Sequence, residues 1–92
     1  MVELTAFQYT LLQAADELVE PSGQDIRRYV NASPFHGPDM NHGRLYPNLE
    51  TIVEAGLVEK GEKNDRTNLY TITDDGKDEL ETRAAYLGQQ HE

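Results

Sequence analysis

The hydrophobic pattern changes its period near Gly56, and this change limits the folds open to a chain of 92 residues. Before Gly56, apolar residues recur every three or four positions, as on one face of a helix. After it, two short runs of β-forming residues flank a polar loop, as in a hairpin. The last stretch returns to helical spacing. A chain of this length fits one domain, so we expect a single α+β, mainly α unit over residues 1–92.

The first predicted helix covers residues 5–19 and begins with a capping box. Thr5 stands at the N-cap and Gln8 at the third helical position, where each side chain can bond the other's backbone N–H. Pro21 follows this helix, which it cannot continue. The predicted apolar face comprises Leu4, Phe7, Leu11, Leu12, Ala15, Leu18 and Val19.

A second, shorter helix is predicted at about residues 22–32, with Arg27 and Arg28 on its outer side. Its predicted inner stripe comprises Ile26, Tyr29 and Val30. Residues 31–41 are predicted to form a loop, because their prolines and glycine interrupt any helix.

The third predicted helix covers residues 42–55. Gly56 is its natural stop, because glycine readily adopts the left-handed conformation that ends many helices. Pro47 lacks a backbone N–H, so we expect the regular helix to begin within a turn upstream of it or to bend there. The predicted buried face comprises Leu45, Leu49, Ile52 and Val53. The predicted outer face comprises Arg44, Pro47 and Thr51, with Asn48 at its border.

The predicted hairpin pairs residues 57–60 with residues 68–73 across a polar loop at 61–67, which should project from the body. Thr73 then caps a last helix of about residues 74–88, whose two leading aspartates suit the positive end of the helix dipole. Gly88 is expected to end this helix, and its predicted apolar stripe comprises Leu80, Ala84 and Leu87.

The charge of the chain is strongly negative, with 17 acidic residues against eight basic ones and a net charge of −9. The excess lies at the two ends, because residues 22–73 hold six of the eight cations against seven anions. Any contact with a polyanion should therefore involve the middle of the chain. The acidic, lysine-poor and weakly hydrophobic composition favours a protein of a high-salt cytoplasm over an ordinary acidic mesophilic one.

Several kinds of site are excluded by what the sequence lacks. It contains no cysteine, which removes disulfides and thiolate metal sites. His36, His42 and His91 do not have the spacing of a zinc site, so we expect neither a metal nor a cofactor. The motif G-x-S-x-G, the P-loop and the glycine-rich dinucleotide fingerprint are all missing, which argues against an enzyme.

Membrane and secretion signals are also missing from the sequence. No apolar run approaches the length of about 18 residues that is typical of a membrane-spanning helix. The first residues lack the basic start and apolar core of a secretion signal. We therefore expect a cytoplasmic protein with no membrane contact.

The element order, three helices and then a hairpin, is that of a winged helix-turn-helix. Its third helix has the size to enter a DNA major groove about 12 Å wide. Residues 42–49 (HGRLYPNL) and 54–58 (EAGLV) resemble the G-x-LYP-x-L…GL[VI] segment of PadR-like transcriptional regulators. Residues 70–76 (YTITDDG) resemble the Y-x-LT-x-x-G ending of their wing, with Ile in place of Leu. More narrowly, the chain is similar to small haloarchaeal proteins like the phage phiH repressor.

The resemblance covers about residues 5–76 and implies a dimeric, sequence-specific DNA-binding regulator, with repression as the expected mode. The helix at about 42–55 would enter the major groove, and the wing at about 61–68 would lie on the backbone or in the minor groove. The domain core would span about 5–73, and the helix at 74–88 would mediate dimerisation. The chain departs from the family in its Pro- and Gly-rich loop and its short last helix. A small-molecule inducer is left open.

The chemistry of each candidate residue has an alternative. Arg44 can contact guanine O6 and N7 with two hydrogen bonds, or pair locally with Asp39 or Asn48. Asn48 can read adenine, bind a phosphate or face solvent. Tyr46 can donate to a phosphate or pack between helices. The predicted DNA-binding residues are Arg27, Asn41, His42, Gly43, Arg44, Tyr46, Pro47, Asn48, Thr51, Lys63, Asn64 and Arg66, and the predicted dimer residues are Phe7, Leu11, Leu80, Ala84 and Leu87.

Two further alternatives concern the basic residues and the function itself. Lys63 and Arg66 can bind phosphates or belong to a solvated turn, and of Arg27 and Arg28 one is expected to brace DNA and the other to pair with a local carboxylate. The alternative function is a winged-helix module that binds protein and not nucleic acid, which the net charge of −9 favours because DNA-binding domains are usually basic.

Overall fold

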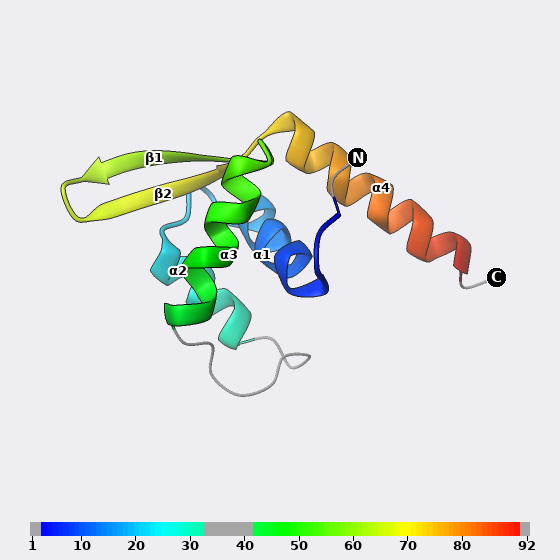
Figure 1. Cartoon of the computed structure of the whole chain (residues 1–92), viewed down its shortest axis with the longest axis horizontal. Coiled ribbons are helices and arrows are strands. Elements are labelled where there is room, and N and C mark those ends of the chain that lie inside the picture. Colours follow the sequence, from blue (N-terminus) through cyan, green and yellow to red (C-terminus); the bar gives the residue numbers. More distant parts are fainter. Residues whose placement is uncertain (1–2, 33–41, 91–92) are drawn as a thin grey trace.

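The computed structural model describes residues 3–32 and 42–90, which form four helices and one hairpin (Figure 1). The elements in chain order are α1 (Ala6–Glu17), α2 (Gly23–Asn31), α3 (His42–Glu54), β1 (Val58–Asn64), β2 (Thr67–Ile72) and α4 (Asp74–Gln90). This order confirms the mainly α winged helix-turn-helix. The predicted loop at 31–41 falls largely outside the described residues, as do Asn41, His36 and His91.

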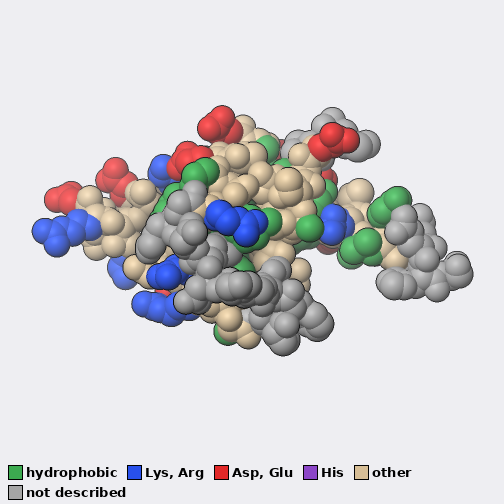
Figure 2. Space-filling view, turned by 60° about the horizontal axis from the view of Figure 1, so that its bottom comes forward, with side chains coloured by type: hydrophobic (Ala, Val, Ile, Leu, Met, Phe, Trp, Pro, Cys, Tyr) green, Lys and Arg blue, Asp and Glu red, His purple; other side chains and the backbone are tan. Residues whose placement is uncertain are grey.

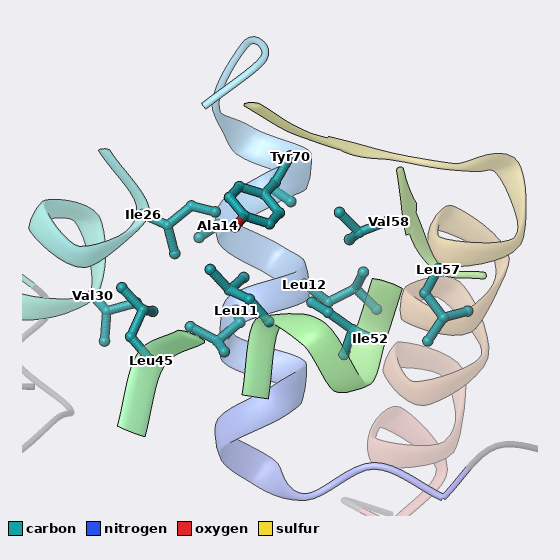
Figure 3. Close-up of a cluster of buried hydrophobic side chains, with 12 residues drawn as sticks. Leu11, Leu12, Ala14, Ile26, Val30, Leu45, Ile52, Leu57, Val58 and Tyr70 are labelled. Carbon is teal, nitrogen blue, oxygen red and sulfur yellow. The ribbon is translucent and has the colours of Figure 1, made fainter. Parts of the chain in front are cut away.

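The core lies where α1, α2 and α3 meet the base of the hairpin (Figure 3). Leu11 and Leu12 of α1 lie between side chains from α2, such as Ile26, and side chains from α3, such as Ile52. The helical spacing of these residues stacks them on one side of each helix, which is why the predicted inner faces are buried. The buried apolar residues are Leu11, Leu12, Ala14, Ala15, Ile26, Val30, Leu45, Leu49, Ile52, Leu57, Val58 and Tyr70.

The start of α1 confirms the predicted capping box, but its end differs from the prediction. The Thr5 hydroxyl accepts from the Gln8 N–H at 3.1 Å, and the Gln8 side chain accepts from the Thr5 N–H at 3.0 Å. The helix stops at Glu17, and the next residue leaves it in an extended conformation. Val19 is thereby carried away from the core and is 91% exposed, so its assignment to the apolar face was wrong.

The hairpin is longer than predicted and its loop is shorter. β1 and β2 pair from Val58 opposite Ile72 out to Asn64 opposite Thr67, which leaves Asp65 and Arg66 as the turn. The predicted loop at 61–67 is therefore mostly strand. The register shifts between Glu62 and Asn64, so Lys63 is the extra residue of a β-bulge, a feature that bends and twists a strand.

The hairpin is joined to the helical body through the turn between α1 and α2. The Tyr70 N–H donates to the Pro21 carbonyl at 2.8 Å, and Ser22 forms an isolated antiparallel bridge with Leu69. The short segment before α2 thus lies along β2 as an added strand. The helix-turn-helix and the hairpin are consequently held by backbone bonds as well as by side-chain packing.

Helix α4 begins at the predicted cap and projects from the body (Figure 1). The Thr73 hydroxyl accepts from the Gly76 N–H at 3.0 Å and donates to the Gly56 carbonyl at 2.7 Å. The helix continues to Gln90, so the prediction that Gly88 ends it was wrong. A glycine inside a helix costs only about 1 kcal/mol relative to alanine, which is not enough to stop the helix. Within residues 3–32 and 42–90, no helix is long and apolar enough to cross a membrane.

Candidate nucleic-acid interface

Helix α3 presents the predicted outer face to solvent. Arg44, Pro47 and Thr51 are exposed, whereas Leu45, Leu49 and Ile52 are fully buried beneath them. Pro47 lies well inside the helix, which begins at His42, and it cannot donate to the carbonyl of Gly43. His42 and Gly43 form the first turn of α3, but their side-chain positions lie outside the described structure. This face therefore offers one cation and several small contacts to a ligand.

Arg44 stacks on an aromatic ring of α1. Its guanidinium carbon lies 4.5 Å from the centre of the Phe7 ring. Asn48 is linked to Arg44 through the backbone, since its side-chain N–H donates to the Arg44 carbonyl at 2.7 Å. The local partner Asp39 of the alternative assignment lies outside the described residues.

Asn48 has a structural role that was not predicted. Its side-chain oxygen accepts from the Gln8 side-chain nitrogen at 2.9 Å, while its side-chain nitrogen donates to the Arg44 carbonyl. Asn48 thereby joins α3 to α1. Each bond uses only one of the two hydrogens or one of the two lone pairs of the amide, so the predicted contact of Asn48 with DNA stays a prediction.

Tyr46 is half-buried and packs against the start of α2, which agrees with the second of its two predicted roles. A Cβ on Gly23 would lie 2.5 Å from the Tyr46 hydroxyl oxygen, so Gly23 makes room for the ring. Sequence reasoning missed Gly23, because the contact joins separate helices. The ring borders a pocket of about 280 Å³ whose lining also includes wing residues: Ser22, Gly23, Gln24, Tyr46, Arg66, Thr67, Asn68 and Tyr70. Burial raises the pKa of the Tyr70 phenol above its usual value.

The outer end of the hairpin carries both signs of charge (Figure 2). Lys63, Asn64 and Arg66 are exposed there, together with the acidic residues Glu62 and Asp65. The Asn64 side-chain oxygen accepts from the Arg66 N–H at 2.9 Å, which stabilises the turn. Figure 2 shows the Lys and Arg side chains of this view mostly at the left end and across the middle of the molecule, and the Asp and Glu side chains mostly along its upper edge.

Two other cations of the middle region form ion pairs. The Arg28 guanidinium lies 3.2 Å from the Asp25 carboxylate, which confirms that one of the two arginines of α2 pairs locally. Arg27 is half-buried beside it. The Lys60 ammonium lies 2.6 Å from the Glu50 carboxylate and so links β1 to α3. This hydrogen bond raises the pKa of Lys60.

Residues 11–82 match the family described as "Transcriptional regulator PadR-like family". The match covers most of the chain. The chain belongs to this family. PadR-like proteins are transcription regulators and not enzymes, which agrees with the prediction made from the sequence.

Solved structures share the fold of this PadR-like protein. The structure of H. salinarum RosR grown from NaBr is similar to this chain, with 39% sequence identity and a TM-score of 0.86. The match covers 96% of this chain and 77% of RosR. RosR in the complex hsRosR-S1 is also 39% identical, with a TM-score of 0.85 over 95% and 75% of the two chains. F93 from STIV, a winged-helix DNA-binding protein, shares the fold at 17% identity, with a TM-score of 0.74 over 94% and 91%. No curated protein matches the chain.

The similarity to RosR, a haloarchaeal regulator, supports the high-salt origin that the composition predicts. This PadR-like protein, with its excess of acidic residues, is therefore similar to a protein from a high-salt organism, where acidic surfaces are expected.

The predicted dimer residues of the PadR-like protein have different environments. Leu11 is fully buried in the core, so its assignment to a dimer surface was wrong. Phe7 lies under Arg44, and Leu80 is half-buried. Ala84 and Leu87 are exposed on α4, next to Tyr86, which the sequence reasoning missed and which is 58% exposed.

A groove of about 770 Å³ runs between the N-terminal segment and α4 of the PadR-like protein. Its lining residues are Glu3, Leu4, Thr5, Tyr9, Glu79, Thr82, Arg83 and Tyr86. Within it the Arg83 guanidinium lies 4.1 Å from the centre of the Tyr9 ring. Across residues 3–32 and 42–90, no group of three or more His, Asp or Glu side chains is arranged to hold a metal ion.

Proposed function

We propose that this protein is a homodimeric, sequence-specific DNA-binding repressor of the cytoplasm. Helix α3 enters the major groove, and the hairpin β1–β2 lies on the backbone or in the minor groove. The repressor mode rests on the resemblance to the phage phiH repressor-like proteins. The proposed DNA contacts are Arg27, Asn41, His42, Gly43, Arg44, Tyr46, Pro47, Asn48, Thr51, Lys63, Asn64 and Arg66.

The observation that carries the proposal is the exposed face of α3 beside the wing. Arg44 is exposed on that face, and an Arg with two bonds to guanine is the commonest base-specific contact. Tyr46 of α3 and Arg66 of the hairpin line the same pocket, so one side of α3 lies next to the wing. The wing carboxylates Glu62 and Asp65 are what favours a protein partner instead.

Arg44→Ala is expected to weaken binding to the preferred DNA site by about 1–3 kcal/mol and to relax the preference at one base pair. Lys63→Ala should weaken binding to all sequences alike, because a phosphate contact carries no sequence information. The measurement selects a site from a random duplex library with the wild-type protein and then titrates both variants. Lys77→Ala on α4 is the control. Unchanged site preference in Arg44→Ala would show that Arg44 does not read a base, whereas the absence of any selected site would favour the protein-binding module.

The dimer is proposed to form through α4, whose exposed Tyr86 and Leu87 need a cover. We expect light scattering at molar KCl to give twice the chain mass of 10.4 kDa. Leu87→Asp should shift the protein to the monomer, because a carboxylate in an apolar contact loses its hydration. Val19→Asp is the matched control, since Val19 is still more exposed but lies outside α4. A monomeric wild type, or Leu87→Asp with the wild-type mass, would contradict this interface. A dimer would read two half-sites about 10 bp apart.

A further inference from the structure

Arg44 is held by α1 from two sides, through its side chain and through its backbone. We propose that Phe7 and Gln8 are positioning residues that fix the direction in which Arg44 meets DNA and thereby set the base preference of α3. This inference rests on the proposed function of α3. It assigns to Phe7 a role in DNA recognition and not in the dimer.

The contact with Phe7 does not itself use the hydrogen-bonding edge of Arg44. The guanidinium carbon lies 4.5 Å from the centre of the Phe7 ring, and the residue remains exposed. The N–H groups of a guanidinium point outward from its central carbon in different directions, so a ring on one side does not cover all of the N–H groups that can contact guanine. Phe7 thus supports the arginine without competing with a base.

The backbone contact is a relay of three hydrogen bonds. The Thr5 N–H donates to the Gln8 side-chain oxygen at 3.0 Å, and the Gln8 side-chain nitrogen donates to the Asn48 oxygen at 2.9 Å. The Asn48 nitrogen in turn donates to the Arg44 carbonyl at 2.7 Å. Gln8 is only 9% exposed, and the capping box fixes its orientation. The start of α1 therefore sets the position of the Arg44 backbone.

The consequence is an arginine that is ordered before DNA arrives. A long side chain that must be immobilised on binding loses rotamer entropy, and a preorganised one avoids that loss. Release of Arg44 should therefore lower the specific affinity by about two- to tenfold, on the usual scale for one immobilised side chain. Affinity for non-specific DNA should hardly change, because that binding depends on phosphate contacts.

Two substitutions separate the side-chain support from the backbone relay. Phe7→Leu keeps an apolar side chain but removes the ring, and Phe7→Trp restores a ring. Gln8→Glu keeps the acceptor for the Thr5 N–H but replaces the donor to Asn48 with an acceptor. Tyr29→Leu is the control for loss of a half-buried ring, since the Tyr29 hydroxyl bonds Glu17 at the other end of α1.

The experiment measures the ratio of specific to non-specific affinity, together with the NMR signals of the Arg44 side chain in the free protein. We expect Phe7→Leu and Gln8→Glu to lower the ratio, Phe7→Trp to restore it and Tyr29→Leu to leave it unchanged. The Arg44 δ-proton signals should show an aromatic ring-current shift that disappears in Phe7→Leu and returns in Phe7→Trp. In an Arg44→Ala background, Phe7→Leu should have no further effect on the ratio.

The possible failures are distinguishable. If the wild type selects a site and Arg44→Ala loses that selection, while Phe7→Leu and Gln8→Glu keep the full ratio, the positioning role is overturned and the proposed function stands. The positioning role is also overturned if Arg44 shows no ring-current shift in the wild type. If the wild type selects no DNA sequence, the proposed function and the positioning role both fail.

Discussion

Gly76→Ala is expected to destabilise the fold by about 3 kcal/mol, the upper part of the range for inserting a methyl group into a packed site. A Cβ on Gly76 would lie 2.2 Å from the Leu57 carbonyl oxygen and 2.7 Å from Cγ1 of Ile72. The Leu57 oxygen belongs to the backbone and already accepts from the Thr73 N–H at 3.0 Å, so it cannot easily move aside. The start of α4 would have to move away from Leu57 and from the end of β2.

Thermal unfolding followed by circular dichroism at molar KCl measures this effect. For a domain of this size, each kcal/mol lowers the melting temperature by about 4–8 °C. Gly61→Ala is the matched control, because no described heavy atom would lie within 4 Å of its Cβ. A melting temperature of Gly76→Ala equal to that of the wild type would show that the start of α4 is not tightly packed.

Affinity for DNA is expected to stay level, or to rise, between about 0.1 and 2 M KCl, a range over which the screening length falls from about 10 Å to about 2–3 Å. An ordinary binder with six to ten phosphate contacts loses about 10³–10⁵ in affinity between 50 and 200 mM salt, because it releases counterions. Here six cations of the middle region face seven anions, and Arg28 and Lys60 already pair with carboxylates of the chain. Few counterions are therefore left to release, and salt screens the wing carboxylates from the phosphates.

The wing provides a matched variant for this salt prediction. Glu62→Gln combined with Asp65→Asn removes two exposed carboxylates, so the variant should bind more tightly at low salt and lose affinity more steeply as salt rises. The wild-type fold should also loosen in dilute buffer, because a net charge of −9 repels itself when it is not screened. A steep loss of wild-type affinity, with full ellipticity at every salt concentration, would contradict the high-salt interpretation and leave DNA binding intact.

The helical core could be predicted because its signals are local. The spacing of Leu45, Leu49 and Ile52 and the capping box at Thr5 each lie within a few residues, and burial and hydrogen bonds confirm both. The hairpin limits could not be predicted in the same way. Along β1 only the first residue, Val58, is buried, so backbone pairing extends through residues that have no hydrophobic alternation. The local signal for the position of the turn was Asn64, whose side-chain oxygen accepts from the Arg66 N–H.

The candidate site could be predicted in its exposed residues but not in their supports. The outward direction of Arg44 follows from its offset against the buried stripe of α3. The contacts that hold it come from Phe7 and Gln8, about 40 positions away, and a single sequence gives no register between α1 and α3. The same lack of register hid the bond between Asn48 and Gln8 and left Gly23 unnoticed beside Tyr46.

The backbone bonds between the α1–α2 turn and β2 hold the hairpin in a fixed orientation relative to the helices. The Pro21 carbonyl and Ser22 are bonded to the strand β2, and Lys60 of β1 pairs with Glu50 of α3, so the distance from α3 to the wing tip is set before DNA binds. In the proposed complex the protein does not adjust this span, so the DNA must supply the matching groove width. Groove width varies with sequence, and deforming a duplex costs energy that depends on the sequence deformed. Two sites with identical contacted bases but different intervening steps would then be told apart by their shape.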